Sequence, residues 1–224
     1  MCESCFDTGT ILDPDHGAIP CAACRLKRNA RRQEVLLKKI PKRYRGVTLE
    51  GLKPQAELHK DQATIIEFMK ANPHANYYLC GENDTGKTHF MWALYEHAVR
   101  AGRNVIATTL HDWIEKNIAS YRENQKLTPF TIADLQQSTF PYSIFIDDID
   151  KKKMTEYVAE MLFNFVDSVY RFKHQIVVTS QLDPERSINK RASLIDHFCD
   201  PDTRYGVGIA RRIVNEETAV FRMF

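Results

Sequence analysis

The sequence contains no long apolar run. No uninterrupted hydrophobic stretch in its 224 residues approaches the ~20 residues that a membrane-spanning helix needs. The opening residues, MCESCFDTGT, include neither the basic nor the apolar segment of a secretory signal. A hydrophobic content of 43% with 27% charged residues is ordinary for a globular protein. We therefore expect a soluble, cytoplasmic protein that makes no membrane contact.

Basic residues are missing from the first 24 positions and concentrated directly after them. Residues 1–24 contain four acidic residues and no Lys or Arg, whereas residues 25–47 contain ten Lys or Arg and one acid. A basic segment of this kind either contacts nucleic acid or an acidic protein surface, or is a solvated linker. The length suits one main domain with a small appendage. We expect a module at 1–24, a basic helix and linker at 25–47, and a main domain at 48–224.

Four cysteines near the amino terminus have the spacing of a zinc site. Cys2, Cys5, Cys21 and Cys24 form two C-x2-C pairs separated by fifteen residues. Two such pairs can converge on one tetrahedral zinc ion, and a reducing cytoplasm disfavours disulfides. So short a module cannot build a sufficient core alone, so the metal would supply folding energy. Four thiolates leave no open coordination position, which indicates a structural zinc.

The stretch GENDTGKT has the pattern of a phosphate-binding loop. It follows a short apolar segment at 76–80 and precedes a helix-compatible run at 89–102, which is the context that the motif requires. Backbone amides of the loop would cradle the phosphates of ATP, Lys87 would reach the terminal phosphates, and Thr88 would bind Mg²⁺. A glycine-rich turn before a helix is the alternative. The residues expected to contact the nucleotide are Gly81, Glu82, Asn83, Asp84, Thr85, Gly86, Lys87, Thr88 and His89.

Further apolar segments alternate with helix-compatible segments along the chain. The apolar segments lie at 104–110, 142–150, 174–181 and 218–224, and helical patterns occupy 26–40, 111–124 and 154–172. With the segment before the phosphate loop, they predict a three-layer α/β/α domain with five mostly parallel strands.

Polar side chains end two of these expected strands. Asp147 and Asp148 follow one apolar run, and Thr179, Ser180 and Gln181 end the next. Ligands of open α/β sheets bind at the carboxyl ends of the strands. We expect Asp147 to hold Mg²⁺, Asp148 to polarise the attacking water, and the polar trio to lie beside the phosphates. The alternative is that the two acids cap a turn.

The combination of motifs resembles a known family. The phosphate loop, FIDDID at 145–150, VVTSQ at 177–181, IARRIV at 209–214 and the lead-in IPKRYRGVTLEGL resemble AAA+ ATPases of the DnaC-type replicative helicase loaders and the IstB-type transposition helpers. The opening CESCFDTGT is similar to the zinc module of some loaders. The resemblance covers nearly the whole chain, and only the phosphate loop is specific by itself.

The resemblance assigns roles to particular residues. Lys87, Asp147, Asp148 and Arg212 would form the catalytic set, with Gln181 as a nucleotide sensor. Arg212 would be the arginine finger that reaches the nucleotide of a neighbouring subunit, which implies self-association through nucleotide interfaces. Its neighbour Arg211 is the second candidate for the finger, and a basic patch at the end of a helix is the alternative for both.

The sequence departs from the family pattern at three places. Asp84 stands where the family usually has glycine, and Glu82 adds a second acid to the loop. Gln181 stands where asparagine is typical. The sequence ends at Phe224 directly after the fifth expected strand, so we expect a minimal helical lid or none.

The resemblance also implies a function. It predicts a slow, DNA-stimulated ATPase that loads a hexameric DnaB-type replicative helicase onto single-stranded DNA, with ATP as an assembly switch. The cysteine module and the basic segment 25–47 would dock the helicase. Single-stranded DNA would be held by basic and aromatic groups, for which Lys116, Tyr121, Arg122 and Lys126 are candidates. A charged surface helix would have the same pattern.

Two other functions fit the same sequence. The chain could be an IstB-like helper that binds duplex DNA and recruits a transposase. It could also be a helicase-binding adaptor of a mobile element whose loop binds ATP without hydrolysis, since Asp84 and the short carboxyl terminus weaken the expected nucleotide site.

Overall fold

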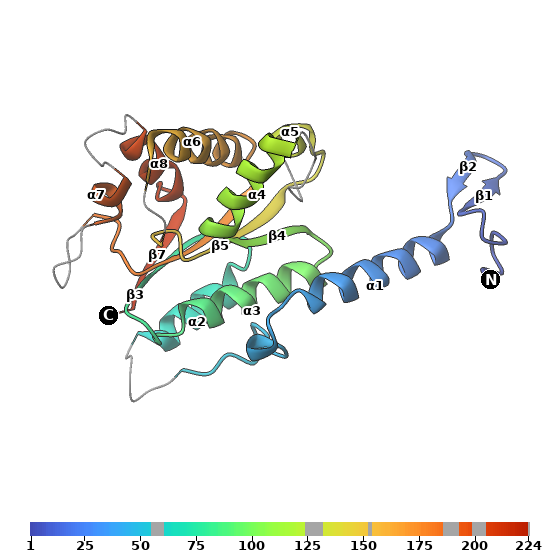
Figure 1. The fold of residues 1–224 in the computed structure, drawn as a ribbon. Coiled ribbons are helices and arrows are strands. Elements are labelled where there is room, and N and C mark those ends of the chain that lie inside the picture. Colours follow the sequence, from blue (N-terminus) through green and yellow to red (C-terminus); the bar gives the residue numbers. More distant parts are fainter. Residues whose placement is uncertain (55–60, 124–131, 152–153, 186–192, 199–204, 224) are drawn as a thin grey trace. The chain divides into compact units, whose positions relative to one another are not determined.

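The computed structural model describes residues 1–54, 61–123, 132–151, 154–185, 193–198 and 205–223 (Figure 1). They belong to two compact units, Met1–Arg45 and Gly46–Phe224. Within the described ranges, no helix is both long and apolar enough to cross a membrane.

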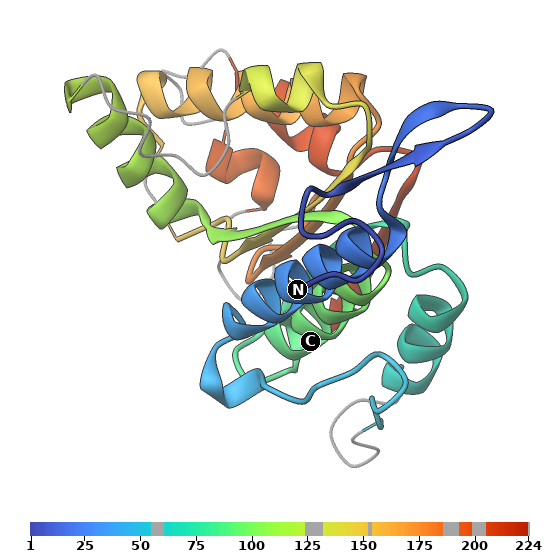
Figure 2. The same ribbon diagram turned by 90° about the vertical axis from the view of Figure 1, so that its right-hand side faces the viewer.

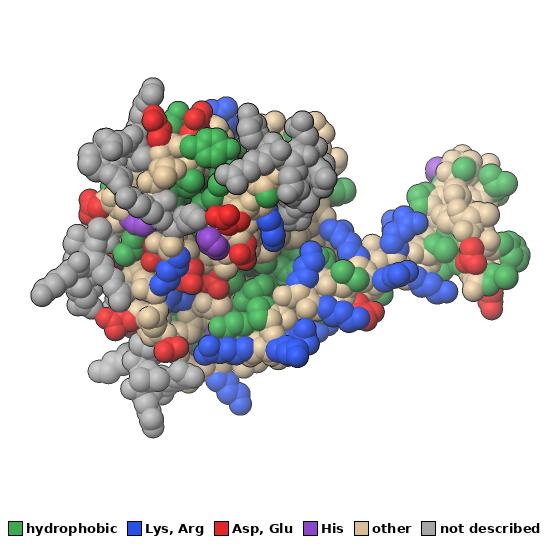
Figure 3. Space-filling view, viewed as in Figure 1, with side chains coloured by type: hydrophobic (Ala, Val, Ile, Leu, Met, Phe, Trp, Pro, Cys, Tyr) green, Lys and Arg blue, Asp and Glu red, His purple; other side chains and the backbone are tan. Residues whose placement is uncertain are grey.

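The first unit combines a hairpin with a basic helix. Strands β1 (Thr10–Asp13) and β2 (Gly17–Pro20) pair antiparallel, followed by α1 (Ala22–Lys38) and the short 3-10 helix η1 (Lys42–Tyr44). The sequence patterns predicted neither hairpin strand. Helix α1 starts four residues before the expected Leu26, so the expected boundary between residues 24 and 25 falls inside it. Lys and Arg side chains follow one another along α1, and none of its residues is buried (Figure 3).

The second unit is built on one sheet of five parallel strands. Their order is β4-β5-β6-β3-β7, and every neighbouring pair is parallel. The bounds are β3 (Asn76–Gly81), β4 (Asn104–Thr109), β5 (Tyr142–Asp147), β6 (Gln175–Ser180) and β7 (Thr218–Met223). The expected five-stranded, mostly parallel sheet is confirmed. The strand expected at 142–150 ends earlier, at Asp147, so that Asp148 lies just beyond the sheet.

Helices cover both faces of this sheet, as Figures 1 and 2 show. One face carries α2 (Gln62–Ala71) and α3 (Lys87–Arg100). The other carries α4 (Leu110–Glu123), α5 (Ile132–Gln137), α6 (Glu156–Arg171), α7 (Leu194–Phe198) and α8 (Gly206–Ile213). The predicted three-layer α/β/α architecture is therefore confirmed.

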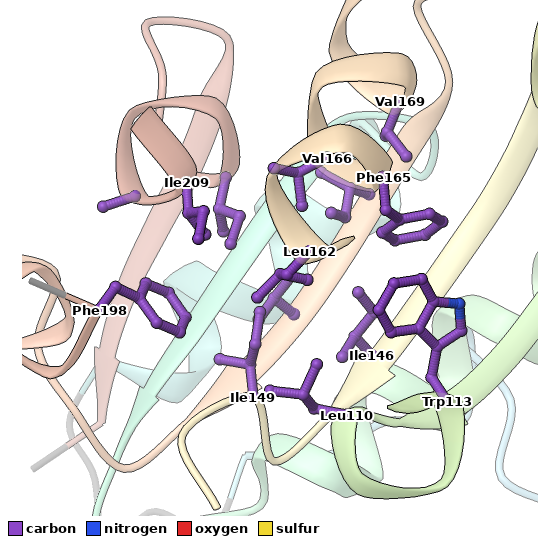
Figure 4. Close-up of a cluster of buried hydrophobic side chains, with 14 of the residues drawn as sticks. Leu110, Trp113, Ile146, Ile149, Leu162, Phe165, Val166, Val169, Phe198 and Ile209 are labelled. Carbon is purple, nitrogen blue, oxygen red and sulfur yellow. The ribbon is translucent and has the colours of Figure 1, made fainter. Parts of the chain in front are cut away.

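Helix α6 anchors the larger core. Thr155 caps its amino end by accepting a hydrogen bond from the Val158 amide (3.4 Å). Its buried stripe includes Val158, Leu162, Phe165 and Val169, three or four residues apart, as one face of an α-helix requires. Figure 4 shows this stripe meeting apolar side chains of α4, β5 and α8. Burying each such side chain contributes about 1.5–3 kcal/mol, which fixes the helical layer to the sheet.

Candidate functional site

The phosphate loop joins β3, which lies between β6 and β7, to the amino end of α3. Gly81 ends the strand with φ +152°, and a Cβ there would lie 2.0 Å from the carbonyl oxygen of Met223 on β7. Gly86 precedes the helix with φ +93°. Asp84 has φ +63°, a left-handed conformation that aspartate adopts more readily than most residues. Asp84 thus occupies a position whose backbone conformation favours glycine.

Lys87 is buried at the base of the loop and bonds to the loop itself. Its Nζ donates to the carbonyl oxygens of Gly81 (2.9 Å) and Glu82 (2.5 Å). Burial lowers the pKa of Lys87, and nearby carboxylates, Asp148 first among them, oppose that shift. The ammonium group therefore lies where incoming phosphates would compete with two backbone carbonyls.

A glutamine of α2 supports the loop from behind. The buried amide of Gln62 donates to the carbonyl oxygen of Thr85 (3.3 Å). Sequence reasoning missed this residue, because α2 carried no motif and a single polar residue in an apolar stretch gave no signal. The exposed loop positions are Glu82, Asn83, Asp84 and, on the first turn of α3, His89.

Two hydroxyls converge on the carboxylate of Asp147. The hydroxyl of Thr88, at the start of α3, donates to Asp147 Oδ1 (3.0 Å), and that of Thr179, near the end of β6, donates to the same oxygen (2.5 Å). The structure thus brings together Thr88 and Asp147, the two expected magnesium ligands. A hydroxyl and a carboxylate oxygen beside a phosphate loop suit Mg²⁺, which prefers oxygen ligands.

Asp148 lies beside this pair in a left-handed turn. Its φ is +53°, and its backbone N–H donates to the hydroxyl of Thr179 (2.9 Å). Burial raises the pKa of Asp148 above its ordinary value of 3.8, with the charge of Asp147 as the next cause. A folded-state pKa above the unfolded value means that folding is favoured at low pH and loses that contribution as pH rises through the folded pKa. Ionised Asp148 therefore destabilises the fold at neutral pH.

Replacing Asp148 by asparagine is expected to raise the stability of the protein and to lower its rate of ATP hydrolysis. Asparagine tolerates the same left-handed turn and removes the like-charge pair, so the melting temperature at pH 7 should rise by about a degree or two after allowance for solvent screening. The gain should shrink as pH falls toward the raised pKa, where Asp148 becomes neutral. ATP hydrolysis should fall about a hundredfold or more if Asp148 polarises water. Melting curves at several pH values and a phosphate-release assay test both effects, and a variant with unchanged turnover would contradict the assigned role.

Gln181 reaches the phosphate loop. Its side-chain amide donates to the Asn83 side-chain oxygen (2.6 Å) although 98 residues separate them. Ser180 turns instead to Asp150, whose carboxylate accepts its hydroxyl (3.0 Å) and the backbone N–H of Gln181 (3.2 Å). At the polar end of β6, Thr179 therefore contacts Asp147, and Gln181 contacts the phosphate loop. Asp150, which sequence reasoning left without a role, holds this end in place.

Arg212 lies at the other edge of the sheet. It sits on α8, its Nε donates to Asp167 on α6 (2.5 Å), and its guanidinium stacks over the ring of Phe163 at 4.4 Å. It lines a pocket together with Asn76, the first residue of β3, whereas the phosphate loop follows the last residue of that strand. A six-residue strand is about 20 Å long. Arg212 therefore cannot serve the nucleotide of its own chain. Its neighbour Arg211 is exposed.

The candidate DNA-contacting residues fall largely outside what the structure describes. Lys116 is exposed on α4. Tyr121 and Arg122 belong to the last turn of α4, but their side chains, and the whole of Lys126, lie outside the described residues.

The four cysteines of the first unit come together as their spacing predicted. All four Sγ atoms lie within 4.8 Å of one another, with 3.7 Å between Cys2 and Cys21 and 3.3 Å between Cys5 and Cys24. A regular tetrahedron with Zn–S bonds of about 2.3 Å would separate its sulfur atoms by about 3.8 Å. The Cys2 amide donates to Asp7 Oδ1 (2.8 Å), which shapes the first cysteine turn. The cluster fits a structural zinc ion.

One comparison with known proteins gives the family of the chain, and another gives its fold. The sequence matches the model of a family described as IstB-like ATP binding protein over residues 23–188. A search of curated proteins found no match.

Solved structures share the fold at low sequence identity. A DnaC helicase loader matches with a TM-score of 0.61 and 16% identity over 82% of this chain and 100% of that one. DnaI matches with a TM-score of 0.60 and 14% identity over 86% and 97%. AMPPCP-bound DnaA from Aquifex aeolicus matches with a TM-score of 0.60 and 17% identity over 83% of this chain and 51% of DnaA. The chain thus spans about half the length of that DnaA. The second unit therefore has the P-loop AAA+ fold of these solved structures.

Proposed function

The chain belongs to the IstB-like ATP-binding family, and on that basis we propose that it is an ATPase that loads a hexameric DnaB-type replicative helicase onto single-stranded DNA in the cytoplasm. The observation that carries this proposal is the likeness to the whole of the solved chain of a DnaC helicase loader, combined with a cysteine cluster at the amino terminus. The family match supports ATP binding. Hydrolysis, the helicase and the DNA are parts of the proposal.

The nucleotide site would hold Mg-ATP with groups that already converge. Amides of the loop and of the α3 amino end would bind the phosphates, and Lys87 would exchange its two carbonyl contacts for phosphate oxygens. Thr88 and Asp147 would hold Mg²⁺, and Asp148 would orient the attacking water. Gln181 would report the state of the loop through its contact with Asn83.

Hydrolysis would need a second subunit. The position of Arg212, at the sheet edge opposite the phosphate loop, supports a finger that acts only in trans. Its ion pair with Asp167 would open or rearrange when a neighbour arrives. ATP would then act as an assembly switch, since completing the site requires both a bound nucleotide and an adjacent subunit.

The first unit would grip the helicase. Helix α1 has no buried residue and carries Lys and Arg side chains along its length. The cysteine hairpin adds two exposed apolar side chains, Phe6 (77% exposed) and Leu12 (88% exposed). A small, rigid, zinc-held unit with apolar tips and a basic helix suits an acidic protein surface with apolar pockets. Lys116, Tyr121, Arg122 and Lys126 would contact single-stranded DNA.

A transposition helper is the second candidate, because the matching family model is named for IstB. Such a protein would bind duplex DNA and recruit a transposase. The partner that the chain retains therefore decides between the two functions.

A pull-down resolved by mass spectrometry tests the proposal. The full chain, with ATP and magnesium, should retain a hexameric helicase from an extract of its source. A chain lacking residues 1–47 should lose it, and so should Cys21→Ser, which breaks the zinc site without removing the basic helix. Lys87→Ala should weaken the ATP dependence of capture and leave the grip in place.

Three outcomes would contradict the loader function. These are retention of a transposase, retention of neither protein, and retention of the helicase by the truncated chain. Helicase capture without any ATP turnover would instead favour the adaptor that binds nucleotide but does not hydrolyse it.

A further inference from the structure

A pocket of about 340 Å³ opens at the amino-terminal edge of the sheet. It is lined by residues at or just before the starts of β3, β4, β5 and β6, and by the segment from α8 to β7. The phosphate loop lies at the opposite edge, about one strand length or 20 Å away. Apart from Arg212, no residue that the sequence motifs or the proposed ATPase site use lines this pocket. The lining residues that matter most are His74, Arg103, Tyr170, Lys173, Gln175 and Arg212.

A buried acceptor without a donor lines this pocket. Gln175 is 4% exposed, and its Nε2 donates to the carbonyl oxygens of Pro73 (3.0 Å) and Ala75 (2.8 Å). Those two acceptors fix the orientation of the amide, so the other atom must be Oε1. Among the described residues Oε1 has no hydrogen-bond partner. A buried polar atom left without a partner is costly. Oε1 is itself sealed from solvent, so a ligand N–H or O–H would satisfy it after a small shift of the lining side chains.

Cations outnumber acids around the pocket. Arg103 is half-buried and donates to the Ser143 hydroxyl (2.6 Å), with no carboxylate partner in the described part of the chain. Burial lowers its pKa, which is the response of a cation that lacks a counter-ion. Lys173 adds a second charge at the rim, and Glu217 is the one acid among the lining residues. Arg212 is already paired with Asp167, so Arg103 and Lys173 are the cations open to an anion.

The remaining groups around the pocket suit a flat, uncharged ring in the same ligand. Tyr170 lines the pocket and is 53% exposed, so its ring offers a face for stacking. Burial and the charge of Arg103 lower the pKa of His74, which keeps this imidazole neutral at physiological pH. His174 is also neutral, since burial lowers its pKa.

We propose that this pocket binds a phosphorylated nucleotide, either free or at the 5′ end of a DNA strand. The phosphate contacts Arg103 and Lys173, the base stacks on Tyr170, and an N–H of the ligand satisfies Gln175 Oε1. The volume lies at the lower end of the range of small-molecule sites, about 300–1,000 Å³. The inference does not rest on helicase loading, because it uses neither the phosphate loop nor the first unit.

Calorimetric titration with adenosine 5′-monophosphate tests the site. This probe lacks the β- and γ-phosphates that Lys87 would contact, so it reports little on the phosphate loop. We expect saturable binding of one molecule per chain, with equal affinity in the Lys87→Ala variant. Lys173→Gly should weaken binding about tenfold, because a charge-assisted contact is lost. Lys173 has φ +51°, which glycine adopts freely, so this variant should be at least as stable as the parent.

Lys151→Gln is the matched control. Lys151 is an exposed cation just beyond β5, at the sheet edge that carries the phosphate loop, so its removal should leave the affinity unchanged. A 5′-phosphorylated oligodeoxynucleotide and its 5′-hydroxyl counterpart distinguish a strand end from a free nucleotide as the natural source.

Several results would overturn the proposal. These are no saturable binding of either phosphorylated probe, adenosine or inorganic phosphate binding as tightly as the monophosphate, and full affinity in Lys173→Gly. The helicase pull-down is independent of all of them, so the two proposals can fail separately.

Discussion

Replacing Arg212 by alanine is expected to lower the ATPase rate of the assembled protein by about a thousandfold, the scale on which arginine fingers act. Each chain should still bind nucleotide, because Arg212 lies a strand length away from its own phosphate loop. Phosphate release, measured at concentrations at which the protein self-associates, gives the rate. Nucleotide binding by titration shows that the loop is intact.

Two controls make this prediction sharp. Arg211→Ala removes an adjacent, exposed arginine of the same helix and should leave the rate within about twofold. Mixing Arg212→Ala with Lys87→Ala should restore part of the activity, since an intact loop on one chain then meets an intact finger on the other. Arg212 also bonds to Asp167, so melting temperatures must be recorded to exclude simple unfolding. Loss of activity in Arg211→Ala, or no recovery in the mixture, would contradict the assignment.

Replacing Gly81 by alanine is expected to cost at least about 4 kcal/mol of unfolding free energy, which places it among the most damaging single substitutions. The new Cβ would lie 2.0 Å from the carbonyl oxygen and 2.6 Å from the carbonyl carbon of Met223. Those atoms belong to the backbone of β7, paired with β3 in register, and cannot turn aside as a side chain could. Urea unfolding of purified protein measures the loss, and poor soluble yield would accompany it.

Gly86→Ala provides the comparison within the same loop. Its φ of +93° strains an alanine, but the nearest atoms lie 3.9 Å away, so we expect a cost of about 1–2 kcal/mol. Equal losses at the two glycines would show that backbone strain, and not the approach of β7, governs this loop.

The sheet could be predicted because its strands are buried on both faces. β5 and β6 read as continuous apolar runs, and the phosphate loop identifies the strand before it and the helix after it. The strand order could not be read from the sequence, since β3 pairs with β6 and β7, which follow it by about 100 residues or more. The β1–β2 hairpin was missed because its strands are four residues long and mostly exposed, which leaves no alternating apolar pattern.

Some contacts of the candidate site could likewise be predicted from the sequence, and others could not. Motif spacing correctly placed Thr88 near Asp147, because strand ends and the helix start of a phosphate loop meet at one edge. The supporting contacts of Gln62 and Asp150 depend on a single polar side chain each, and nothing in the local sequence marks them. The pocket around Gln175 joins residues from His74 to Glu217, a span that no local pattern can reveal.

The two ends of the parallel strands carry different groups. Every strand of the sheet runs the same way, so one edge carries the phosphate loop and the other carries Arg212. A two-fold pairing with its axis perpendicular to the strands would bring each loop to the other chain's Arg212, whereas a head-to-tail row would repeat a single loop-to-Arg212 contact. An open row of subunits would always end in one unfinished site. Activity per chain would therefore rise with the length of such a row, because the unfinished site becomes a smaller share of all sites.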